Sequence, residues 1–260
     1  MMLRRLIDHV RNQQWTAIGI DFVIVVIGVF VGIQVSNWNA AREESRRAAV
    51  FTDRLKTDLV REAWAYEYLI AYNRETNRNQ RRVLDALTGE APLSDEQFVI
   101  GAYRATQYKY NDRFRSTFDE LVSTGTIGLI ADQEMRETAG AIFTTPLFDT
   151  ISQEASQSEY RRLFRETVPA AIQEALLERC GDHFATVLDY SALVGSIDYP
   201  CTLGLPAAKI EATAIALKAL PRLVPALQLR FADNQTALTD LQTNNKAVVK
   251  SLRAMRGRTK

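Results

Sequence analysis

One apolar run near the N-terminus limits what this chain can be. From Thr16 to Val35 the only charged residue is Asp21. A helix of about 20 apolar residues, rising ~1.5 Å per residue, spans the ~30 Å hydrocarbon layer of a bilayer. Trp15 and Trp38 flank the run, and indole rings favour the headgroup level. The sequence therefore predicts a transmembrane helix over residues 16–36 with a tryptophan interface anchor at each end.

A cleaved signal peptide is the alternative for this run. Its apolar part would be shorter, about 7–15 residues, and an A-x-A-like site would follow it. Here the run is longer and ends in QVSNWNAAREE, so we expect an uncleaved signal anchor. Residues 1–15 place leucine, isoleucine and valine on one helical face with arginines opposite, which predicts a cytoplasmic interfacial segment.

The orientation of the span is not decided by counting charges, because arginines flank both of its ends. Large domains translocate largely regardless of charge, whereas a short arginine-rich tail moves outward unfavourably. We therefore expect a cytoplasmic N-terminus and an extramembrane helical domain, 37–260, outside the cytoplasm. Cys180 and Cys201 agree with this orientation, since an even pair around a loop-like segment predicts a disulfide in an oxidising compartment.

The span has one unusual face. Five of its residues fall on a single helical stripe: Asp21, Val25, Gly28, Gly32 and Ser36. The Gly28-x-x-x-Gly32 spacing lets another helix approach closely, and an ionisable residue in a span usually faces protein or a water-filled site. We predict that this stripe binds another membrane helix. The alternative is a plain anchor in which Asp21, near the end of the span, snorkels or is protonated among the headgroups.

Beyond Trp38 the sequence predicts helices. The run from Asn39 to Tyr72 contains no Gly or Pro, and its apolar residues recur at helical spacing. The span is therefore expected to continue as one helix that lasts to Leu87. Within it, the segment 73–82, NRETNRNQRR, is polar on all sides, which predicts fraying or contact with a partner.

Local signals mark further helices and one long loop. Ser94 and Gln97 form a capping box that opens a helix. Gly125 is a left-handed terminator, and a new helix is expected near Asp132. After a helix that stops at Gly181, the stretch 181–206 has no sustained period and is predicted to be a loop tied by the disulfide.

The end of the chain carries the strongest periodic pattern. Residues spaced alternately by three and four form a heptad seam: Val224, Leu227, Phe231, Asn234, Leu238, Leu241, Asn245, Val248, Leu252 and Met255. Such a seam packs against another helix, and Asn234 and Asn245 are expected to fix the coiled-coil register. The partner is either the long first helix, antiparallel, or the same helix of another subunit. The predicted fold is all-α, with one N-terminal transmembrane helix continuing into an elongated bundle with a heptad-patterned C-terminal helix.

Signatures of chemistry are missing from the sequence. The formal net charge of +1 gives no electrostatic footprint for nucleic acid. His9 and His183 are the two histidines, and no nucleotide-binding, nucleophile or metalloprotease motif occurs. Cys180 and His183 have C-x-x-H spacing, so a zinc site is an alternative to the disulfide. We expect a protein that is not an enzyme, with no cofactor, no catalytic residue and no metal.

The predicted long helix also carries a group of aromatic side chains. Trp64, Tyr66, Tyr68 and Tyr72 are expected to pack in the core, and the alternative is that they line a ligand pocket.

Two stretches resemble an uncharacterised family of bacterial single-span membrane proteins. They are IGIDFVIVVIGVFVGIQVSNWNAARE and STFDELVSTGTIGLIADQEMRE. The matching positions are Asp21, Gly28, Asn37, Trp38, Asn39, Gly125 and Ile130. The resemblance implies a bacterial inner-membrane setting, and it implies no activity. In that setting, the orientation expected above places the C-terminal domain in the periplasm. The acidic residue near the cytoplasmic end of one span is also similar to the proton-coupled single-span subunits of bacterial stator motors, whose exported domains differ.

These observations favour a membrane-anchored helical protein that serves as an assembly, accessory or scaffold subunit. Its partners would be the lipid bilayer and a membrane protein or a second copy of itself. The alternatives are a periplasmic sensor or ligand-binding bundle that uses the Trp64 to Tyr72 aromatics, and a stator-like subunit that couples protons through Asp21.

Overall fold

The computed structural model describes residues 15–110 and 112–257, and within them every regular element is a helix. In chain order these are α2 (Trp15–Thr88), α3 (Asp95–Ala105), α4 (Ser116–Ser123), the 3-10 helix η1 (Ile127–Leu129), α5 (Gln133–Thr144), α6 (Leu147–Ser156), α7 (Glu159–Thr167), α8 (Ala170–Cys180), α9 (Ala192–Gly195), α10 (Ala207–Lys218), α11 (Leu223–Thr239), the π-helical segment η2 (Asp240–Asn244) and α12 (Lys246–Gly257). The predicted all-α fold is confirmed. The predicted interfacial segment and His9 lie outside the described residues.

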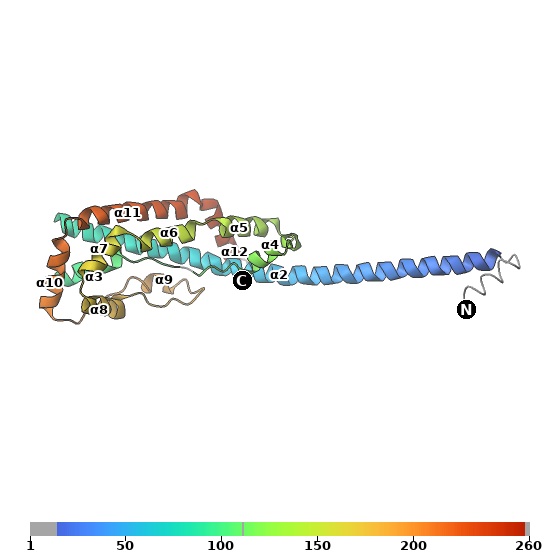
Figure 1. Cartoon of the computed structure of the whole chain (residues 1–260), viewed down its shortest axis with the longest axis horizontal. Helices are drawn as coiled ribbons and strands as arrows, with labels where there is room; N and C mark the ends of the chain where they lie inside the picture. The colour runs from blue at the N-terminus through green and yellow to red at the C-terminus, as the bar shows by residue number, and fades with distance from the viewer. Residues whose placement is uncertain (1–14, 111, 258–260) are drawn as a thin grey trace.

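Helix α2 organises the molecule. It runs without a break for 74 residues, which at ~1.5 Å per residue is about 110 Å. Its first half, residues 15–50, extends away from the other helices and is called the rod below (Figure 1). Its second half is the central helix of the bundle. The helix ends beside Gly89, which has a φ of 84° that suits glycine. The expected continuation of the apolar run into the domain is confirmed.

Three groups of buried apolar side chains surround the second half of α2. The first, next to the rod, joins α2 near Leu55 to α4, α5, α6 and α12. The second, at the far end of the domain, joins α2 near Val83 to α3, α7, α8, α10 and α11. The third joins Trp64, Tyr68 and Tyr72 to the segment that carries α9. Because α2 contributes to all three groups, the domain is built around the continuation of the apolar run.

The local signals at helix ends are confirmed. Ser94 accepts a hydrogen bond from the Gln97 amide, and the Gln97 side chain accepts from the Ser94 amide. Gly125 follows α4 with a φ of 68°. The Asp132 carboxylate accepts from the Met135 amide at 3.0 Å and caps α5.

The C-terminal seam extends over two helices rather than one. Helices α11 and α12 both pack against α2, so the intramolecular partner is the one that forms. The π-helical segment η2 separates them, and Asn245 leaves the helical backbone region with a ψ of 24°. The heptad pattern does not predict this break, because the seam positions keep their alternate spacing of three and four residues across it.

One face of the polar segment 73–82 is packed inside the bundle, and its arginines lie on the exposed face. Its buried side chains are Asn73, Glu75, Thr76, Asn79 and Gln80. The expectation that this segment frays or waits for a partner is wrong, because α3 and α11 of the same chain cover it. Groups on α3 and α11 form hydrogen bonds with the buried polar side chains of the segment. One of these bonds runs from Gln80 Nε2 to the Ala105 carbonyl, at 3.3 Å.

Candidate functional site

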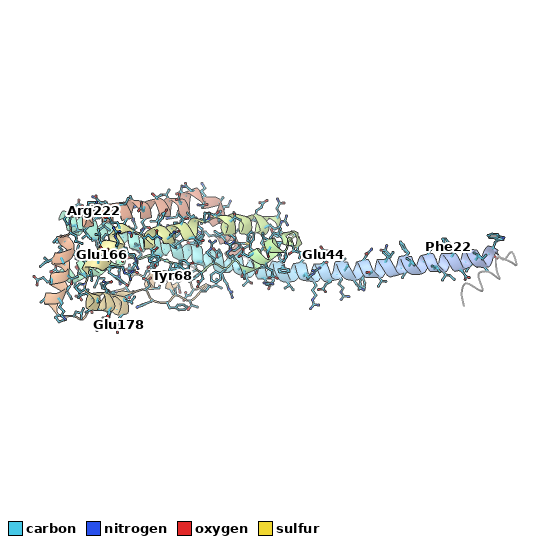
Figure 2. All side chains as sticks on the ribbon, viewed as in Figure 1. Phe22, Glu44, Tyr68, Glu166, Glu178 and Arg222 are labelled. Atoms are coloured by element: carbon cyan, nitrogen blue, oxygen red, sulfur yellow. A yellow bond between two sulfur atoms is a disulfide. The ribbon has the colours of Figure 1, made fainter. Side chains whose placement is uncertain are left out.

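The predicted membrane-helix face lies on the rod. The one described helix that is long and apolar enough to cross a membrane is α2, by length and composition. Large apolar side chains from Ile20 to Val35 are about half exposed or more, and none of them is covered by the domain. Figure 2 shows side chains projecting from the rod, Phe22 among them, with no other helix beside it. Such a wide apolar surface needs a covering of lipid or protein.

The stripe of Asp21, Val25, Gly28, Gly32 and Ser36 is open in the single chain. A methyl group added to either glycine would meet no described atom within 4 Å. Backbone is therefore accessible along this face, which is the condition for close helix approach.

The two tryptophans that bracket the run are both exposed. Trp15 and Trp38 are 69% and 63% exposed, as interface anchors would be. The Arg42 guanidinium lies 5.8 Å from the centre of a Trp38 ring. The rod continues through residues 37–50, about 20 Å of helix, before the domain begins to bury it.

The aromatic group of α2 packs on two faces of the helix. Trp64 and Tyr68 have ring centroids 5.2 Å apart, and Tyr68 and Tyr72 have theirs 6.3 Å apart. Trp64 donates to the Asp189 carbonyl at 3.2 Å, and the Tyr72 hydroxyl donates to Asp182 at 2.7 Å. These three rings hold the 181–206 segment against α2, so the packing interpretation is confirmed for them.

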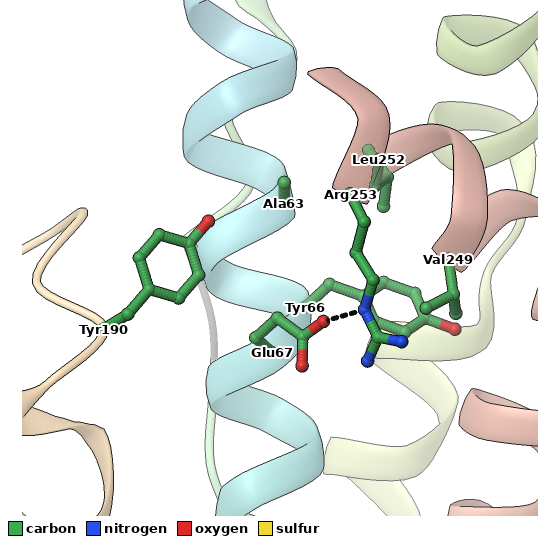
Figure 3. Close-up of a pocket in the computed structure, with 7 residues that line it drawn as sticks. All are labelled: Ala63, Tyr66, Glu67, Tyr190, Val249, Leu252 and Arg253. Atoms are coloured by element: carbon green, nitrogen blue, oxygen red, sulfur yellow. Dashed lines mark hydrogen bonds and ion pairs between the residues drawn. The ribbon is translucent and has the colours of Figure 1, made fainter. Parts of the chain in front are cut away.

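Tyr66 points to the other side, under α12. Its hydroxyl donates to the Leu241 carbonyl at 2.8 Å. Figure 3 shows it among residues of α2 and α12, with Glu67 and Arg253 joined by an ion pair of 2.5 Å. Tyr66 therefore secures the C-terminal helices and does not share a site with the other three aromatics.

A small cleft of about 130 Å³ remains beside Trp64 and Tyr68. The Lys109 ammonium lies 4.7 Å from the centre of the Tyr68 ring at this cleft, and Phe184 at its edge is 90% exposed. The volume is below the ~300–1,000 Å³ of ordinary ligand pockets, so this aromatic wall serves packing first.

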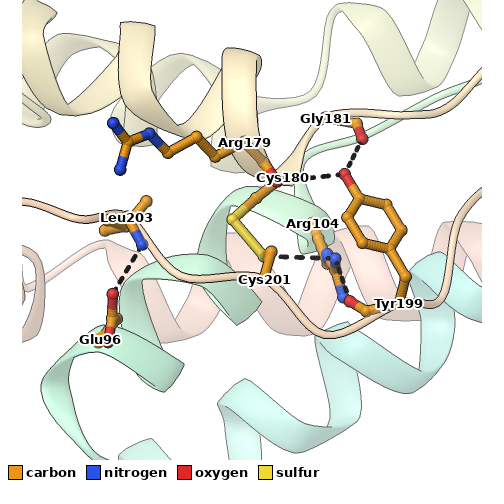
Figure 4. Close-up of a disulfide and its surroundings, with 8 residues drawn as sticks. All are labelled: Glu96, Arg104, Arg179, Cys180, Gly181, Tyr199, Cys201 and Leu203. Carbon is orange, nitrogen blue, oxygen red and sulfur yellow. Dashed lines mark hydrogen bonds between the residues drawn. A yellow bond between two sulfur atoms is a disulfide. The ribbon is translucent and has the colours of Figure 1, made fainter.

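Cys180 and Cys201 form a disulfide. Their Cα atoms are 5.5 Å apart, an ordinary separation for such a bond, and it joins the end of α8 to the far end of the predicted loop. Figure 4 shows Arg104 between the loop and α3, donating to the Tyr199 carbonyl at 2.8 Å. The Leu203 amide donates to Glu96 at 2.7 Å, which fixes the loop to the start of α3.

The zinc alternative fails on this geometry. Both cysteine sulfurs are used by the disulfide, and a disulfide sulfur is not a thiolate ligand. His183 is stacked on Tyr199 with ring centroids 3.9 Å apart. Among the described residues no group of three histidines, cysteines or carboxylates is placed to hold a metal ion.

The two seam asparagines have different roles. Asn234 is fully buried, and its amide donates to the Asn73 carbonyl at 2.9 Å and to Gln80 Oε1 at 3.3 Å. These bonds cross from α11 to α2, as a register-fixing residue requires. Asn245 instead donates to the Asp240 carbonyl of its own segment at 2.9 Å. It stabilises the break between α11 and α12, and its side chain forms no hydrogen bond across the seam to any residue that the structure describes.

The structure contains a buried ion pair that was not predicted from the sequence. Glu62 is fully buried on α2, and its carboxylate accepts from Arg113 Nε at 2.6 Å and from the Phe114 amide at 3.0 Å. One turn earlier, Asp58 accepts from the Thr117 amide at 3.1 Å, at the start of α4. The sequence contains a sign of these contacts, because Asp58 and Glu62 share a helical stripe with the apolar Leu55. Carboxylates on a stripe that faces the core need a buried hydrogen-bond donor or counter-charge from another helix.

The fold and these surfaces define an all-α protein whose single long N-terminal helix is both an exposed apolar rod and the axis of a bundle. The chain belongs to a family of unknown function (DUF6090), whose family model matches residues 21–152. The match begins at Asp21 and includes both stripe glycines, Glu62 and Arg113, whereas the disulfide and the C-terminal seam lie beyond it. Comparisons with curated proteins and with solved structures give no match.

Proposed function

We propose that this chain is a membrane-anchored, non-enzymatic helical protein that acts as an assembly or accessory subunit. Its span binds a further membrane helix through the stripe that carries Asp21, Gly28 and Gly32. The observation that carries this proposal is the open backbone above both glycines on a rod that the domain leaves uncovered. Two small residues four apart let helix backbones approach closely, so that dispersion contacts accumulate along the crossing.

Asp21 adds a reason for a protein partner on the same face. A carboxyl within a span costs several kcal/mol, about 2.5–3.5 on insertion scales, unless it reaches the interface or a polar partner. A helix seated on the glycines would lie next to Asp21, because the three residues share the stripe. The partner is therefore expected to offer a hydrogen-bond donor or a basic group at that depth.

The continuous helix connects the span to the domain. Residues 55–84 of α2 contribute to the bundle core, and no Gly or Pro interrupts the helix between Gly32 and Gly89. Binding at the span would thus fix the rotation of the domain about the membrane normal. We place the domain outside the cytoplasm of a bacterial inner-membrane protein, in the periplasm, and the disulfide supports this compartment.

The test compares two glycine substitutions in the full chain, extracted from native membranes with mild detergent. Gly28→Ile places a branched side chain on the stripe, and Gly19→Ile places the same side chain about 180° around the helix, at ~100° per residue. Neither added Cβ meets a described atom within 4 Å, so both variants should fold. We expect Gly28→Ile to lose the larger complex and its co-purifying protein and Gly19→Ile to keep them. Complexes of unchanged size and composition in both variants would refute the stripe as an interface.

Substitutions at Asp21 separate a polar contact from a charge. Asp21→Asn keeps the branched shape and one hydrogen-bonding oxygen, whereas Asp21→Leu keeps a similar shape and removes both oxygens. We expect the complex to survive the first and to weaken in the second. A complex that assembles with Asn while its cellular activity is lost would instead favour proton coupling at Asp21.

A further inference from the structure

A second cleft lies between the end of α3 and helices α7 and α8. These three helices belong to the part of the domain away from the rod (Figure 1). The volume of the cleft is about 240 Å³. The lining residues that matter here are Tyr103, Arg161, Phe164, Arg165, Gln173 and Leu177. It is a different place from the Trp64 cleft, and no feature of the proposed membrane interface depends on it.

Two arginines one helical turn apart face this cleft. Arg161 donates one bond to the Thr106 carbonyl, at 3.1 Å, and lies with its guanidinium carbon 4.9 Å from the centre of the Tyr108 ring. Burial, together with the positive charge of Arg165, lowers the pKa of Arg161. Across residues 15–110 and 112–257 neither Arg161 nor Arg165 forms an ion pair. Like charges four apart on a helix repel, so this pair is destabilising as it stands.

A third guanidinium lies behind the same wall. Arg230 on α11 is 4% exposed, and it donates to the Gln107 carbonyl at 3.3 Å. Its buried Nε has no hydrogen-bond partner in the described part of the chain. Burial lowers the pKa of Arg230 to about 10, and Arg161 contributes to that shift. Asp233 opposes the shift at Arg230, but within residues 15–110 and 112–257 no carboxylate forms an ion pair with Arg161, Arg165 or Arg230.

The other walls of the cleft supply apolar surface and rigidity. Leu177 is 71% exposed, whereas Phe164 in the same lining is buried. Gln173 donates to the carbonyls of Arg165 and Val168, at 2.9 and 2.8 Å, which holds the end of α7 against α8. The carboxylate at this cleft, Glu174, is exposed and forms no ion pair with either arginine among the described contacts.

We propose that this cleft binds a small organic anion, with a carboxylate or phosphate held by Arg161 and Arg165 and an apolar part seated on Leu177. Guanidinium groups bind these oxyanions through paired, charge-assisted hydrogen bonds. An anion bound between Arg161 and Arg165 would offset their mutual repulsion, because it attracts both guanidinium groups. A volume below the ~300 Å³ of common ligand pockets limits the ligand to a small molecule.

The test measures thermal unfolding of the full chain in neutral detergent with four probes: phenyl phosphate, benzoate, inorganic phosphate and uncharged benzyl alcohol. Each is titrated to about 10 mM, because a ligand that binds the native state raises the Tm in a saturable way. We expect a rise with phenyl phosphate or benzoate, a smaller one with inorganic phosphate and none with benzyl alcohol. No saturable rise with any of the three anions, or an equal rise with the alcohol, would overturn the proposal.

Three variants locate the effect. Arg165→Gln removes an exposed side chain that forms no hydrogen bond or ion pair with the described residues, so its fold should be intact, and Arg161→Gln removes the half-buried partner. Arg162→Gln is the matched control, since that side chain is 68% exposed and pairs with Glu166 on the solvent side. We expect at least about tenfold weaker binding in the first two variants and unchanged binding in the control. Equal affinity in Arg165→Gln and the wild type would show that the anion binds elsewhere.

Discussion

Arg113 and Glu62 form a buried ion pair, with Arg113 Nε 2.6 Å from Glu62 Oε1 and with 10% and 0% of their side chains exposed. Arg113 also donates to the Ile142 carbonyl at 2.9 Å, and its guanidinium carbon lies 4.3 Å from the centre of the Phe148 ring. The pair thus joins α2 to the ends of α5 and α6. A buried pair of this kind holds separate helices in one arrangement, although its net contribution to stability is small.

Removing one partner of this pair should be costly. Arg113→Ala leaves the Glu62 carboxylate buried without its counter-charge, and we expect a loss of about 3–5 kcal/mol in the free energy of unfolding by urea. Arg115→Ala is the control, because Arg115 pairs with Asp119 at 2.9 Å on the surface and should cost below about 1 kcal/mol. Equal losses in the two variants would contradict the importance of burial.

The same carboxylate should make stability depend on pH. Burial raises the pKa of Glu62 above its ordinary 4.5, against the opposing attraction of Arg113. Between the ordinary and the raised pKa the folded state therefore binds more protons than the unfolded state, so unfolding free energy falls as pH rises through this window. Glu62→Gln cannot titrate and should lack this slope. Urea unfolding of both proteins over a pH series checks the difference, and parallel curves would argue against the raised pKa.

Asn234 and Asn245 should differ in their effect on stability. Asn234→Ala deletes both bonds to α2 and leaves the buried Asn73 carbonyl and Gln80 side chain without this donor. We expect a loss of about 1–3 kcal/mol in urea unfolding. Asn245→Ala deletes one half-buried bond within its own segment and should cost about 1 kcal/mol or less. The reverse order would show that the break at η2, rather than the α11 to α2 contact, fixes the C-terminal helices.

The disulfide should stabilise the domain. It closes a loop with a sequence separation of 21, for which the chain-entropy estimate is about 3 kcal/mol. Cys201→Ser should lose about that amount in chemical unfolding, and a thiol reductant should lower wild-type stability to the same level without affecting the variant. A wild type that is insensitive to reductant after full reduction, verified by thiol labelling, would contradict this prediction.

Features encoded by neighbouring residues could be predicted from the sequence. The apolar run, the capping box at Ser94, the turn at Gly125 and the cap at Asp132 each depend on a few adjacent residues, and each is found where expected. The cysteine pair was predictable for a related reason, because two cysteines allow one intramolecular pairing.

The membrane stripe is also defined by the sequence, through helical spacing that the structure preserves. Its partner is not, because the surface that would cover Asp21, Gly28 and Gly32 belongs to another helix. Pairing through this face stays a prediction until the glycine variants are compared.

What the tertiary structure decided is the fate of polar groups far apart in the chain. The segment 73–82 has the composition of a solvated helix, and one face of it is buried because α11, more than 150 residues later, brings the Asn234 amide to within 2.9 Å of the Asn73 carbonyl. Glu62 likewise obtains its counter-charge from Arg113, 51 residues away. A periodic pattern states which face of a helix is apolar, but the free energy of burying a polar group depends on the partner that packing supplies. That partner is known only once the helices are assembled.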